Sequence, residues 1–164
     1  MTAKRITPAP VRRTLHVNAE PARAFDVFTR RIAAWWPVGH TLLRSPVKET
    51  VIEPGAGGRW YQRGEDGSQC DIGRVLAWDP PARLLLAWQL NAAWQFDPGL
   101  VTEVAVAFLE DGPGRTRVEF EHRLLERMGE NSEALRGQID APDGWTAILE
   151  CYRACADGIT TEAA

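Results

Sequence analysis

Apolar and polar residues alternate along several stretches of this chain, and a period of two is the pattern of β-strands. The first stretch covers residues 11–19, where Val11, Leu15 and Val17 alternate with polar or charged neighbours. Further strands are predicted downstream because similar apolar stretches are bounded by glycine, proline or acidic residues. They cover residues 47–54, 59–63, 69–81 and 82–90.

The alternation is clearest between residues 100 and 125, which predict a β-hairpin. The residues that share one side are Thr102, Val104, Val106 and Phe108 on the first arm, and Thr116, Val118, Phe120 and His122 on the second. The sequence Glu-Asp-Gly-Pro-Gly between the arms supplies the turn. The Gly-Ala-Gly-Gly sequence at 55–58 also predicts a turn, because a strand and not a GK[ST] helix follows it.

Residues 20–36 follow a helical period, with a proline at the position where a helix starts. The apolar residues recur three and four positions apart, and they are Phe25, Phe28, Ile32, Trp35 and Trp36. Thr29 and the double arginine after it predict a break into two short helices, and Pro37 ends the second one.

Residues 142–158 predict a second amphipathic helix that ends at Gly158. The apolar residues at helical spacing are Trp145, Ile148, Leu149, Tyr152, Ala156 and Ile159. The polar segment between residues 126 and 141 predicts a loop with a helical turn.

These elements predict an α+β fold in which a strongly curved antiparallel sheet of six or seven strands wraps around the helix at 142–158. A sheet with one apolar face needs a cover, and a curved sheet around a single helix encloses a cavity. The short helices at 21–36 are expected to plug one mouth of that cavity. A length of 164 residues favours a single domain over 11–164, preceded by a disordered leader at 1–10.

Charge and composition exclude several partners. A net charge of −3 without any long basic run argues against nucleic acid and against a membrane surface. No apolar run approaches a membrane span, and the N-terminus lacks the apolar region of a signal peptide. Three cysteines predict reduced thiols in a cytoplasmic protein. Cys151 and Cys155 lack further ligands at metal-binding spacing, so we expect no metal and no cofactor.

The chain holds seven tryptophans but two tyrosines, and indoles suit cores, pocket walls and interfaces alike. The adjacent Trp35 and Trp36 point about 100° apart on a helix, so we predict that one packs into the core and the other lines the pocket mouth. A ligand is expected to contact the indoles and the residues in phase with the apolar sheet face. These are Trp36, Trp60, Trp88, Thr102, Val104, Val106, Phe120, His122, Trp145, Leu149 and Tyr152.

His122 leaves three alternatives open because it lies on the apolar side of its strand. The imidazole could bind a ligand, could act as an acid or base, or could be a core histidine paired with a neighbouring carbonyl.

Several strings resemble the START-like superfamily, also called SRPBCC or helix-grip, and its branch similar to the C-terminal domain of the activator of the heat-shock protein 90 ATPase. The resemblance covers residues 11–158 and rests on AFDVFTRRIAAWWP, EPGAGGRWYQR, GRVLAWDPPARLLLAW, VTEVAVAF, GRTRVEFEHRLL and GWTAILECYRACADG. It implies a helix-grip fold, and the superfamily includes hydrophobic-ligand binders, polyketide cyclases and dehydratases, and ring-hydroxylase subunits.

We therefore expect a non-catalytic domain that binds a small hydrophobic or aromatic ligand in an internal apolar cavity. One alternative is an enzyme of the polyketide cyclase/dehydratase type that uses general acid–base chemistry. Another is a chaperone-associated interaction module, which predicts an exposed apolar patch. A homodimer contact is left open as a further alternative.

Overall fold

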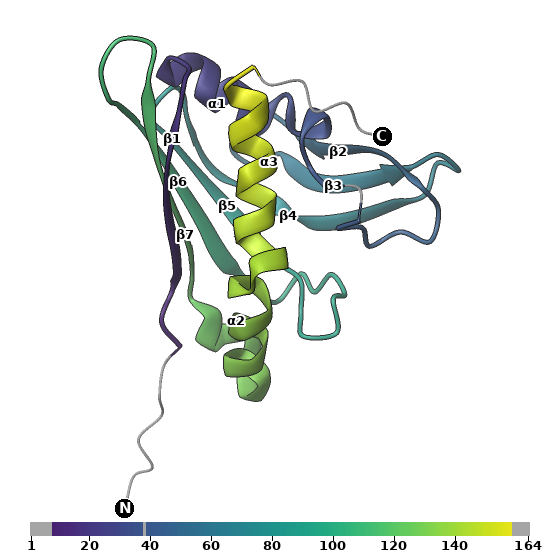
Figure 1. Cartoon of the computed structure of the whole chain (residues 1–164). Helices are drawn as coiled ribbons and strands as arrows, with labels where there is room; N and C mark the ends of the chain where they lie inside the picture. Colours follow the sequence, from purple (N-terminus) through teal and green to yellow (C-terminus); the bar gives the residue numbers. More distant parts are fainter. Residues whose placement is uncertain (1–7, 38, 159–164) are drawn as a thin grey trace, which may run out of the picture.

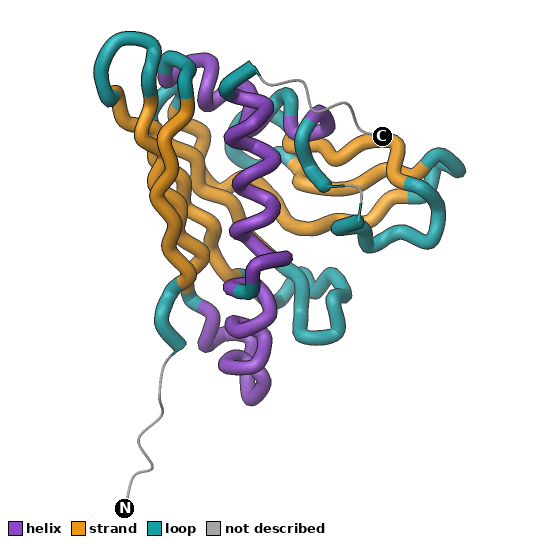
Figure 2. The backbone as a smooth tube through the Cα atoms, in the orientation of Figure 1, coloured by secondary structure: helices purple, strands orange, loops and turns teal. Residues whose placement is uncertain are grey.

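A computed structural model describes residues 8–37 and 39–158, and its centre is one antiparallel sheet of seven strands (Figures 1 and 2). The strand order is β1-β7-β6-β5-β4-β3-β2, so the first two strands in the sequence form the two edges. The strands are β1 (Val11–Val17), β2 (Val47–Ile52), β3 (Arg59–Gly64), β4 (Gln69–Asp79), β5 (Arg83–Trp88), β6 (Thr102–Glu110) and β7 (Thr116–Arg123). The predicted α+β fold and its curved sheet are confirmed. Residues 1–7 of the predicted leader lie outside the described residues.

The β6–β7 hairpin has the predicted alternation. Buried and more exposed side chains alternate along both strands, and Val106 pairs with Phe120 in the register. Gly112 and Gly114 in the turn have φ angles of 90° and 68°, which glycine adopts without a Cβ clash. The pairing therefore directs one apolar row toward the interior and leaves the other row facing outward.

The helical segment after β1 is divided as the sequence predicts. Helix α1 (Pro21–Thr29) is followed by the 3-10 turn η1 (Ile32–Ala34). The Thr29 hydroxyl donates to the Phe25 carbonyl oxygen at 2.8 Å, a back-bond within the last turn of α1. The two pieces cover one end of the curved sheet (Figure 1).

The segment after β7 differs from the prediction in two respects. A 3-10 segment η2 (Leu125–Asn131) leads into a nine-residue helix α2 (Ser132–Asp140), where we expected a loop with a helical turn. The helix forms because Leu135 and Ile139, four residues apart, bury one face of it.

The expected helix at 142–158 is also shorter and bent. A wide π turn η3 (Pro142–Thr146) comes first, and the regular helix α3 spans Ala147–Ala156. A Cβ at Gly144 would lie 2.3 Å from the Ile139 carbonyl oxygen, so the close approach of α2 to η3 requires glycine there. Gly158 has a φ of 80° just after the helix end, while Ile159 lies outside the described residues.

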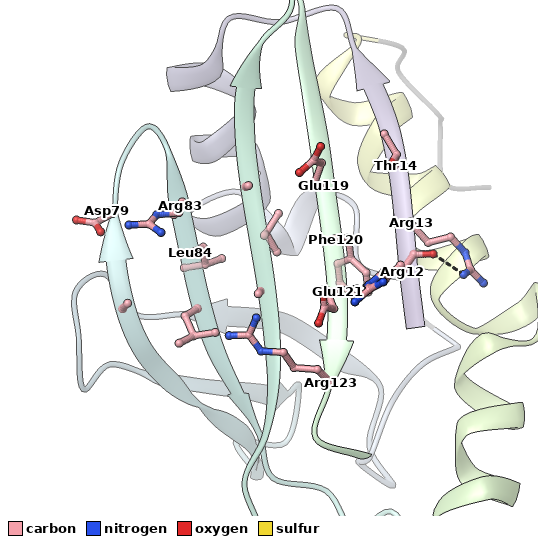
Figure 3. Close-up of a pocket in the computed structure, with 15 residues that line it drawn as sticks. Arg12, Arg13, Thr14, Asp79, Arg83, Leu84, Glu119, Phe120, Glu121 and Arg123 are labelled. Carbon is pink, nitrogen blue, oxygen red and sulfur yellow. Dashed lines mark hydrogen bonds and ion pairs between the residues drawn. The ribbon is translucent and has the colours of Figure 1, made fainter. Parts of the chain in front are cut away.

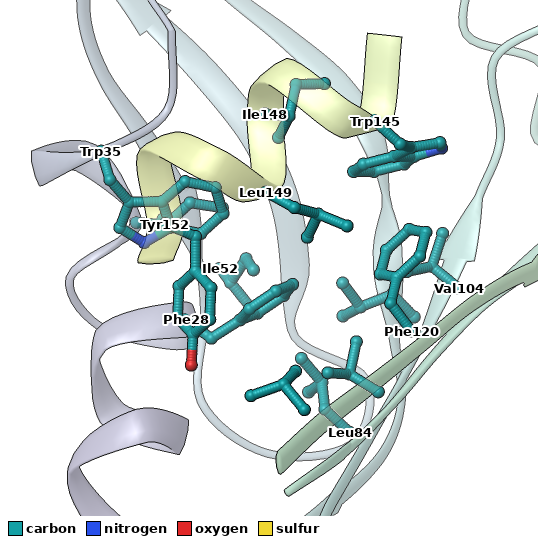
Figure 4. Close-up of a cluster of buried hydrophobic side chains, with 14 of the residues drawn as sticks. Phe28, Trp35, Ile52, Leu84, Val104, Phe120, Trp145, Ile148, Leu149 and Tyr152 are labelled. Atoms are coloured by element: carbon teal, nitrogen blue, oxygen red, sulfur yellow. The ribbon is translucent and has the colours of Figure 1, made fainter. Parts of the chain in front are cut away.

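Helix α3 lies across the concave face of the sheet, and its apolar side forms the core with the inward residues of the strands (Figure 4). Tyr152 is fully buried, and its hydroxyl donates to the Ala24 carbonyl oxygen at 2.8 Å. Burial raises the pKa of this phenol, so it stays protonated and keeps its hydrogen bond to α1. The core therefore joins both helices to the sheet.

Candidate functional site

A cavity of about 600 Å³ lies at the end of the interior opposite α1, between the sheet, the α2–η3 joint and two loops. Its walls come from the segment after η1, from β3, β4 and β5, from the β5–β6 loop, and from α2, η3 and α3. The lining residues are Trp36, Gly39, His40, Thr41, Leu42, Gln62, Ile72, Trp88, Leu90, Trp94, Gln138, Ile139, Ala141, Asp143, Gly144, Trp145 and Ile148. The volume lies within the range of small-molecule sites, roughly 300–1,000 Å³.

Four indoles form most of the aromatic wall: Trp36, Trp88, Trp94 and Trp145. Trp145 has its ring centroid 5.5 Å from Trp88 and 6.3 Å from Trp36, and both pairs meet edge to face. The ring of Trp94 meets Trp88 at 6.4 Å in the same way. Indoles from four separate segments therefore meet around one space, and such a wall favours a flat apolar guest.

The loop at the cavity mouth is held by hydrogen bonds to the backbone of His40. Its carbonyl oxygen accepts from Nε1 of Trp36 at 3.0 Å and from Nε2 of Gln62 at 2.9 Å. Nε2 of the His40 ring donates to the Asp143 carbonyl oxygen at 2.8 Å, because a carbonyl can only accept. The ring thereby links the mouth loop to η3, and its Nδ1 is buried without a partner among the described residues.

His122 lies behind the wall, fully buried, and both of its ring nitrogens are paired. Nε1 of Trp145 donates to Nδ1 at 3.1 Å, so Nδ1 accepts and Nε2 carries the hydrogen. Nε2 then donates to the Thr102 hydroxyl at 2.9 Å, and that hydroxyl donates to the Trp88 carbonyl oxygen at 3.0 Å. Burial lowers the pKa of His122 to about 3, so the ring is neutral. The chain of bonds fixes two wall residues, Trp88 and Trp145.

The structure brings part of the predicted set together. Trp36, Trp88 and Trp145 line the cavity. The remaining predicted residues are buried in the interior but are not among the lining residues of the cavity: Trp60, Thr102, Val104, Val106, Phe120, His122, Leu149 and Tyr152. Trp35 is buried, and its Nε1 donates to the Val27 carbonyl oxygen at 2.7 Å. The pair Trp35–Trp36 is thus divided between core and cavity as expected, and ligand binding by these residues stays a prediction.

The prediction missed the lining residues from loops and from α2. Gln138 and Ile139 are missing from the prediction because the sequence predicts a loop where α2 forms. Trp94 lies in the loop between β5 and β6 and is not among the predicted ligand contacts. One local signal for this loop is Asn91, because an asparagine side chain can accept the backbone N–H two residues on and so form a turn.

A metal or a membrane span finds no support in the part of the chain that the structure describes. No group of three or more His, Cys, Asp or Glu side chains there could hold a metal ion. Cys151 is exposed on α3, whereas Cys70 is half-buried, and this burial raises the pKa of the Cys70 thiol. Within 8–37 and 39–158 no helix is long and apolar enough to cross a bilayer.

The Gly-Ala-Gly-Gly sequence at 55–58 lies in the connection between β2 and β3, as expected for a turn between two strands.

A second hollow of about 520 Å³ lies on the face of the sheet turned away from α3 (Figure 3). Small side chains such as Ala105 and Ala107 form its floor, and arginines and carboxylates form its rim. The rim charges are partly paired with one another, because Arg12 contacts Glu121 at 3.2 Å. An apolar ligand therefore fits the inner cavity better than this outer hollow.

Comparisons with known proteins found a matching family model and similar solved structures. A family model described as Activator of Hsp90 ATPase homolog 1-like protein matches residues 18–154. A search of curated proteins gave no match. A solved structure described as an anthrahydroquino-γ-pyrone synthase, Txn09, complexed with SUM is 35% identical over 90% of this chain and 96% of that chain, with a TM-score of 0.63.

Two other solved structures are similar over nearly their whole length. CalC, described as a self-sacrificing resistance protein from Micromonospora echinospora, is 30% identical over 93% of this chain and 97% of that chain, with a TM-score of 0.69. The Aha1 dimer from Colwellia psychrerythraea is 13% identical over 93% and 99%, with a TM-score of 0.62, and shows the fold alone. The chain belongs to the Activator of Hsp90 ATPase homolog 1-like family, within the START-like superfamily.

Proposed function

We propose that this protein binds a small, flat aromatic molecule in the cavity beneath α2 and η3. The single observation that carries the proposal is the convergence of four indoles on one space of about 600 Å³. Aromatic rings that meet edge to face leave their faces or edges available to a planar guest, and each aromatic contact adds to the burial of apolar area.

The scarcity of charged groups in the lining supports the proposal further. Lysine and arginine do not occur in the lining, and Asp143 is the one acidic residue. A bound molecule would therefore lose little hydration to unpaired charges, and its affinity would come from burial of its rings. One similar structure supports this class of ligand, since it is described as an anthrahydroquino-γ-pyrone synthase.

The test is a fluorescence titration with phenol, 2-naphthol and 2-hydroxyanthraquinone, which share a hydroxyl group and differ in ring number. The wall tryptophans should be quenched saturably, and affinity should rise with each added ring because each ring buries more apolar area. Equal, non-saturable quenching by all three compounds would contradict the proposal.

A matched pair of tryptophan variants separates a cavity effect from a general one. Trp36 and Trp78 are both partly buried, but only Trp36 lines the cavity. Trp36→Ala should weaken binding of 2-naphthol, and Trp78→Ala should leave it unchanged. Equal weakening by both variants would indicate that the loss comes from a disturbed fold.

Acid–base catalysis in the same cavity is a second candidate, favoured by the 35% identity to a synthase. The titratable side chains in the lining are His40 and Asp143, whereas His122 has no carboxylate partner in its paired network. Benzoylacetone in D2O provides the test, because a general base accelerates hydrogen–deuterium exchange at its central carbon. Exchange above the buffer rate that disappears in His40→Gln would support catalysis, and exchange at the buffer rate would contradict it.

The contact with a chaperone stays a prediction. Its expected signature is an exposed apolar patch, and the large exposed apolar residues among those described are Trp94 and Leu109. Trp94 belongs to the cavity mouth, so its exposure fits the proposed binding site without a protein partner.

A further inference from the structure

We infer that Trp94 is the outer wall of the ligand site and that Asn91 is the residue that positions it. The inference rests on the proposed function and adds a ligand size, because the half-open ring of Trp94 offers apolar area at the cavity that a larger planar guest covers more fully than a small one. It therefore assigns to this cavity planar ligands of several fused rings in preference to single-ring compounds.

The backbone of Trp94 is the first observation. Its φ angle is 58°, in the left-handed region that non-glycine residues seldom occupy and that bulky residues avoid. Strained conformations of this kind persist where the surrounding structure imposes them, and they gather at ligand-binding sites. A glycine at this position would relieve the strain but would present no ring.

The exposure of Trp94 is the second observation. The side chain is 41% exposed although it is among the largest apolar groups of the protein. Its ring contacts Trp88 at the cavity, with the centroids 6.4 Å apart. The residue therefore does not complete the core, since much of its apolar surface remains open beside the cavity where a guest could cover it.

The loop around Trp94 is built by the side chain of Asn91. Its Oδ1 accepts from the backbone N–H of Ala93 at 2.9 Å and of Gln95 at 3.0 Å. The backbone N–H of Trp94 donates to the Asn91 carbonyl oxygen at 2.9 Å. These bonds enclose Trp94 on both sides in the sequence and hold it in the left-handed conformation.

The base of the same loop is fixed to the sheet. The backbone carbonyl oxygen of the buried Gln89 accepts from the N–H of Asp97 at 2.8 Å, and the side-chain Nε2 of Gln89 donates to the Pro98 carbonyl oxygen at 3.3 Å. Leu90 pairs with Phe96 across the loop. The position of the Trp94 ring is therefore set before a ligand binds, which reduces the entropy lost on binding.

The first experiment measures the dissociation constants of 2-hydroxyanthraquinone and of 2-naphthol for Trp94→Gly and Trp94→Ala. Loss of one stacking ring should weaken binding of the tricyclic compound by up to about tenfold, which corresponds to about 1.4 kcal/mol, the upper end of the range for one aromatic contact. Binding of 2-naphthol should change less, because the smaller compound can lie against the buried indoles alone. Leu109→Ala, the other exposed large apolar residue, is the matched control and should alter neither constant.

The second experiment distinguishes positioning from mere loop integrity. An aspartate carboxylate can accept the same two backbone N–H groups as the asparagine side chain. Asn91→Asp should therefore keep the wild-type affinity for 2-hydroxyanthraquinone, whereas Asn91→Ala should lose it to the same extent as Trp94→Gly.

The outcomes separate this inference from the proposed function. Wild-type protein that binds 2-naphthol but shows the same affinity for 2-hydroxyanthraquinone as Trp94→Gly would overturn the inference alone. Wild-type protein that binds neither compound would overturn both. The inference would be supported if Trp94→Gly and Asn91→Ala both weakened binding of 2-hydroxyanthraquinone more than binding of 2-naphthol, while Asn91→Asp kept the wild-type affinity.

Discussion

The two ends of the interior are built from the same residue types but differ in how completely they are paired. At the α1 end, Phe28, Trp35 and Tyr152 pack with ring centroids 5.0 to 5.3 Å apart. The indole of Trp35 and the phenol of Tyr152 both donate to carbonyl oxygens of α1. At the opposite end, four indoles surround a cavity, and one of them is exposed on a left-handed backbone.

This difference is the reason for assigning the proposed ligand site to the open end. A fully paired aromatic cluster contributes to the free energy of unfolding, and nothing in it is left for a ligand to satisfy. An open cluster with a strained, exposed ring gives up stability that a ligand can restore. The aromatic content of the chain thus serves two purposes, and the adjacent Trp35 and Trp36 lie on opposite sides of that division.

The largest expected effect sharpens this contrast at the tryptophan pair. Trp35→Ala should lower the free energy of unfolding by about 3–5 kcal/mol because it leaves a cavity in a packed core. Trp36→Ala should lower it much less, because this ring already borders open space, but should weaken ligand binding. Urea unfolding of both variants checks this, and equal losses of stability would remove the distinction between the two ends.

The next effect concerns His122, whose hydrogen-bond network holds the cavity-wall residues Trp88 and Trp145. Because the pKa of His122 is about 3 in the folded protein and about 6.5 in the unfolded chain, only the unfolded chain takes up this proton as the pH falls between those values. Stability should therefore drop by about 2 kcal/mol as the pH falls from 6.5 to 5, and should be retained above 6.5. Unfolding by urea across this range measures it.

His16→Gln is the control for that titration, because His16 is an exposed histidine on β1. The variant should retain the fall in stability below pH 6.5. A flat profile in the wild-type protein would contradict the neutral, fully buried state of His122.

A smaller effect tests the pairing of the closed end. Tyr152→Phe removes the hydroxyl that donates to the Ala24 carbonyl oxygen but keeps the ring. The free energy of unfolding should fall by about 1 kcal/mol, the net value of a buried hydrogen bond, while binding of 2-naphthol stays unchanged. Thermal and urea unfolding give the first quantity, and a change in the dissociation constant would show that the two ends are not independent.

The smallest expected effect has the opposite sign. Trp94→Gly should leave the free energy of unfolding unchanged or raise it by up to about 1 kcal/mol, because glycine accepts a positive φ without strain. The same substitution should weaken binding of 2-hydroxyanthraquinone. A clear loss of stability would mean that Trp94 is a core residue, and the open end would then resemble the closed one.

The sequence predicts the sheet and the helical cover because these follow from local periodicity. Alternation at 102–108 and 116–122 suffices to assign an inward row to both arms of the hairpin. Helix α2 was missed because two apolar residues, Leu135 and Ile139, give too weak a stripe among polar neighbours. Periodicity indicates a burial side for each residue and does not distinguish a core position from a cavity wall.

The cavity itself depends on where separate elements stop, which no local pattern encodes. Its walls combine a bend at Gly144 with a loop shaped by Asn91 and a mouth held by His40. Residues in phase with the apolar face, such as Phe120 and Leu149, therefore lie in the core. Trp94, by contrast, lines the cavity from a loop. Tertiary arrangement, more than residue type, separates the two groups.

A crystal structure of the protein with 2-hydroxyanthraquinone tests the central claim most directly. The account predicts density for the planar ring system in the cavity, bordered by Trp36, Trp145 and Trp94, with the Asn91 loop unchanged. Density in the outer hollow instead, or an unoccupied cavity at a ligand concentration that saturates the fluorescence change, would contradict it.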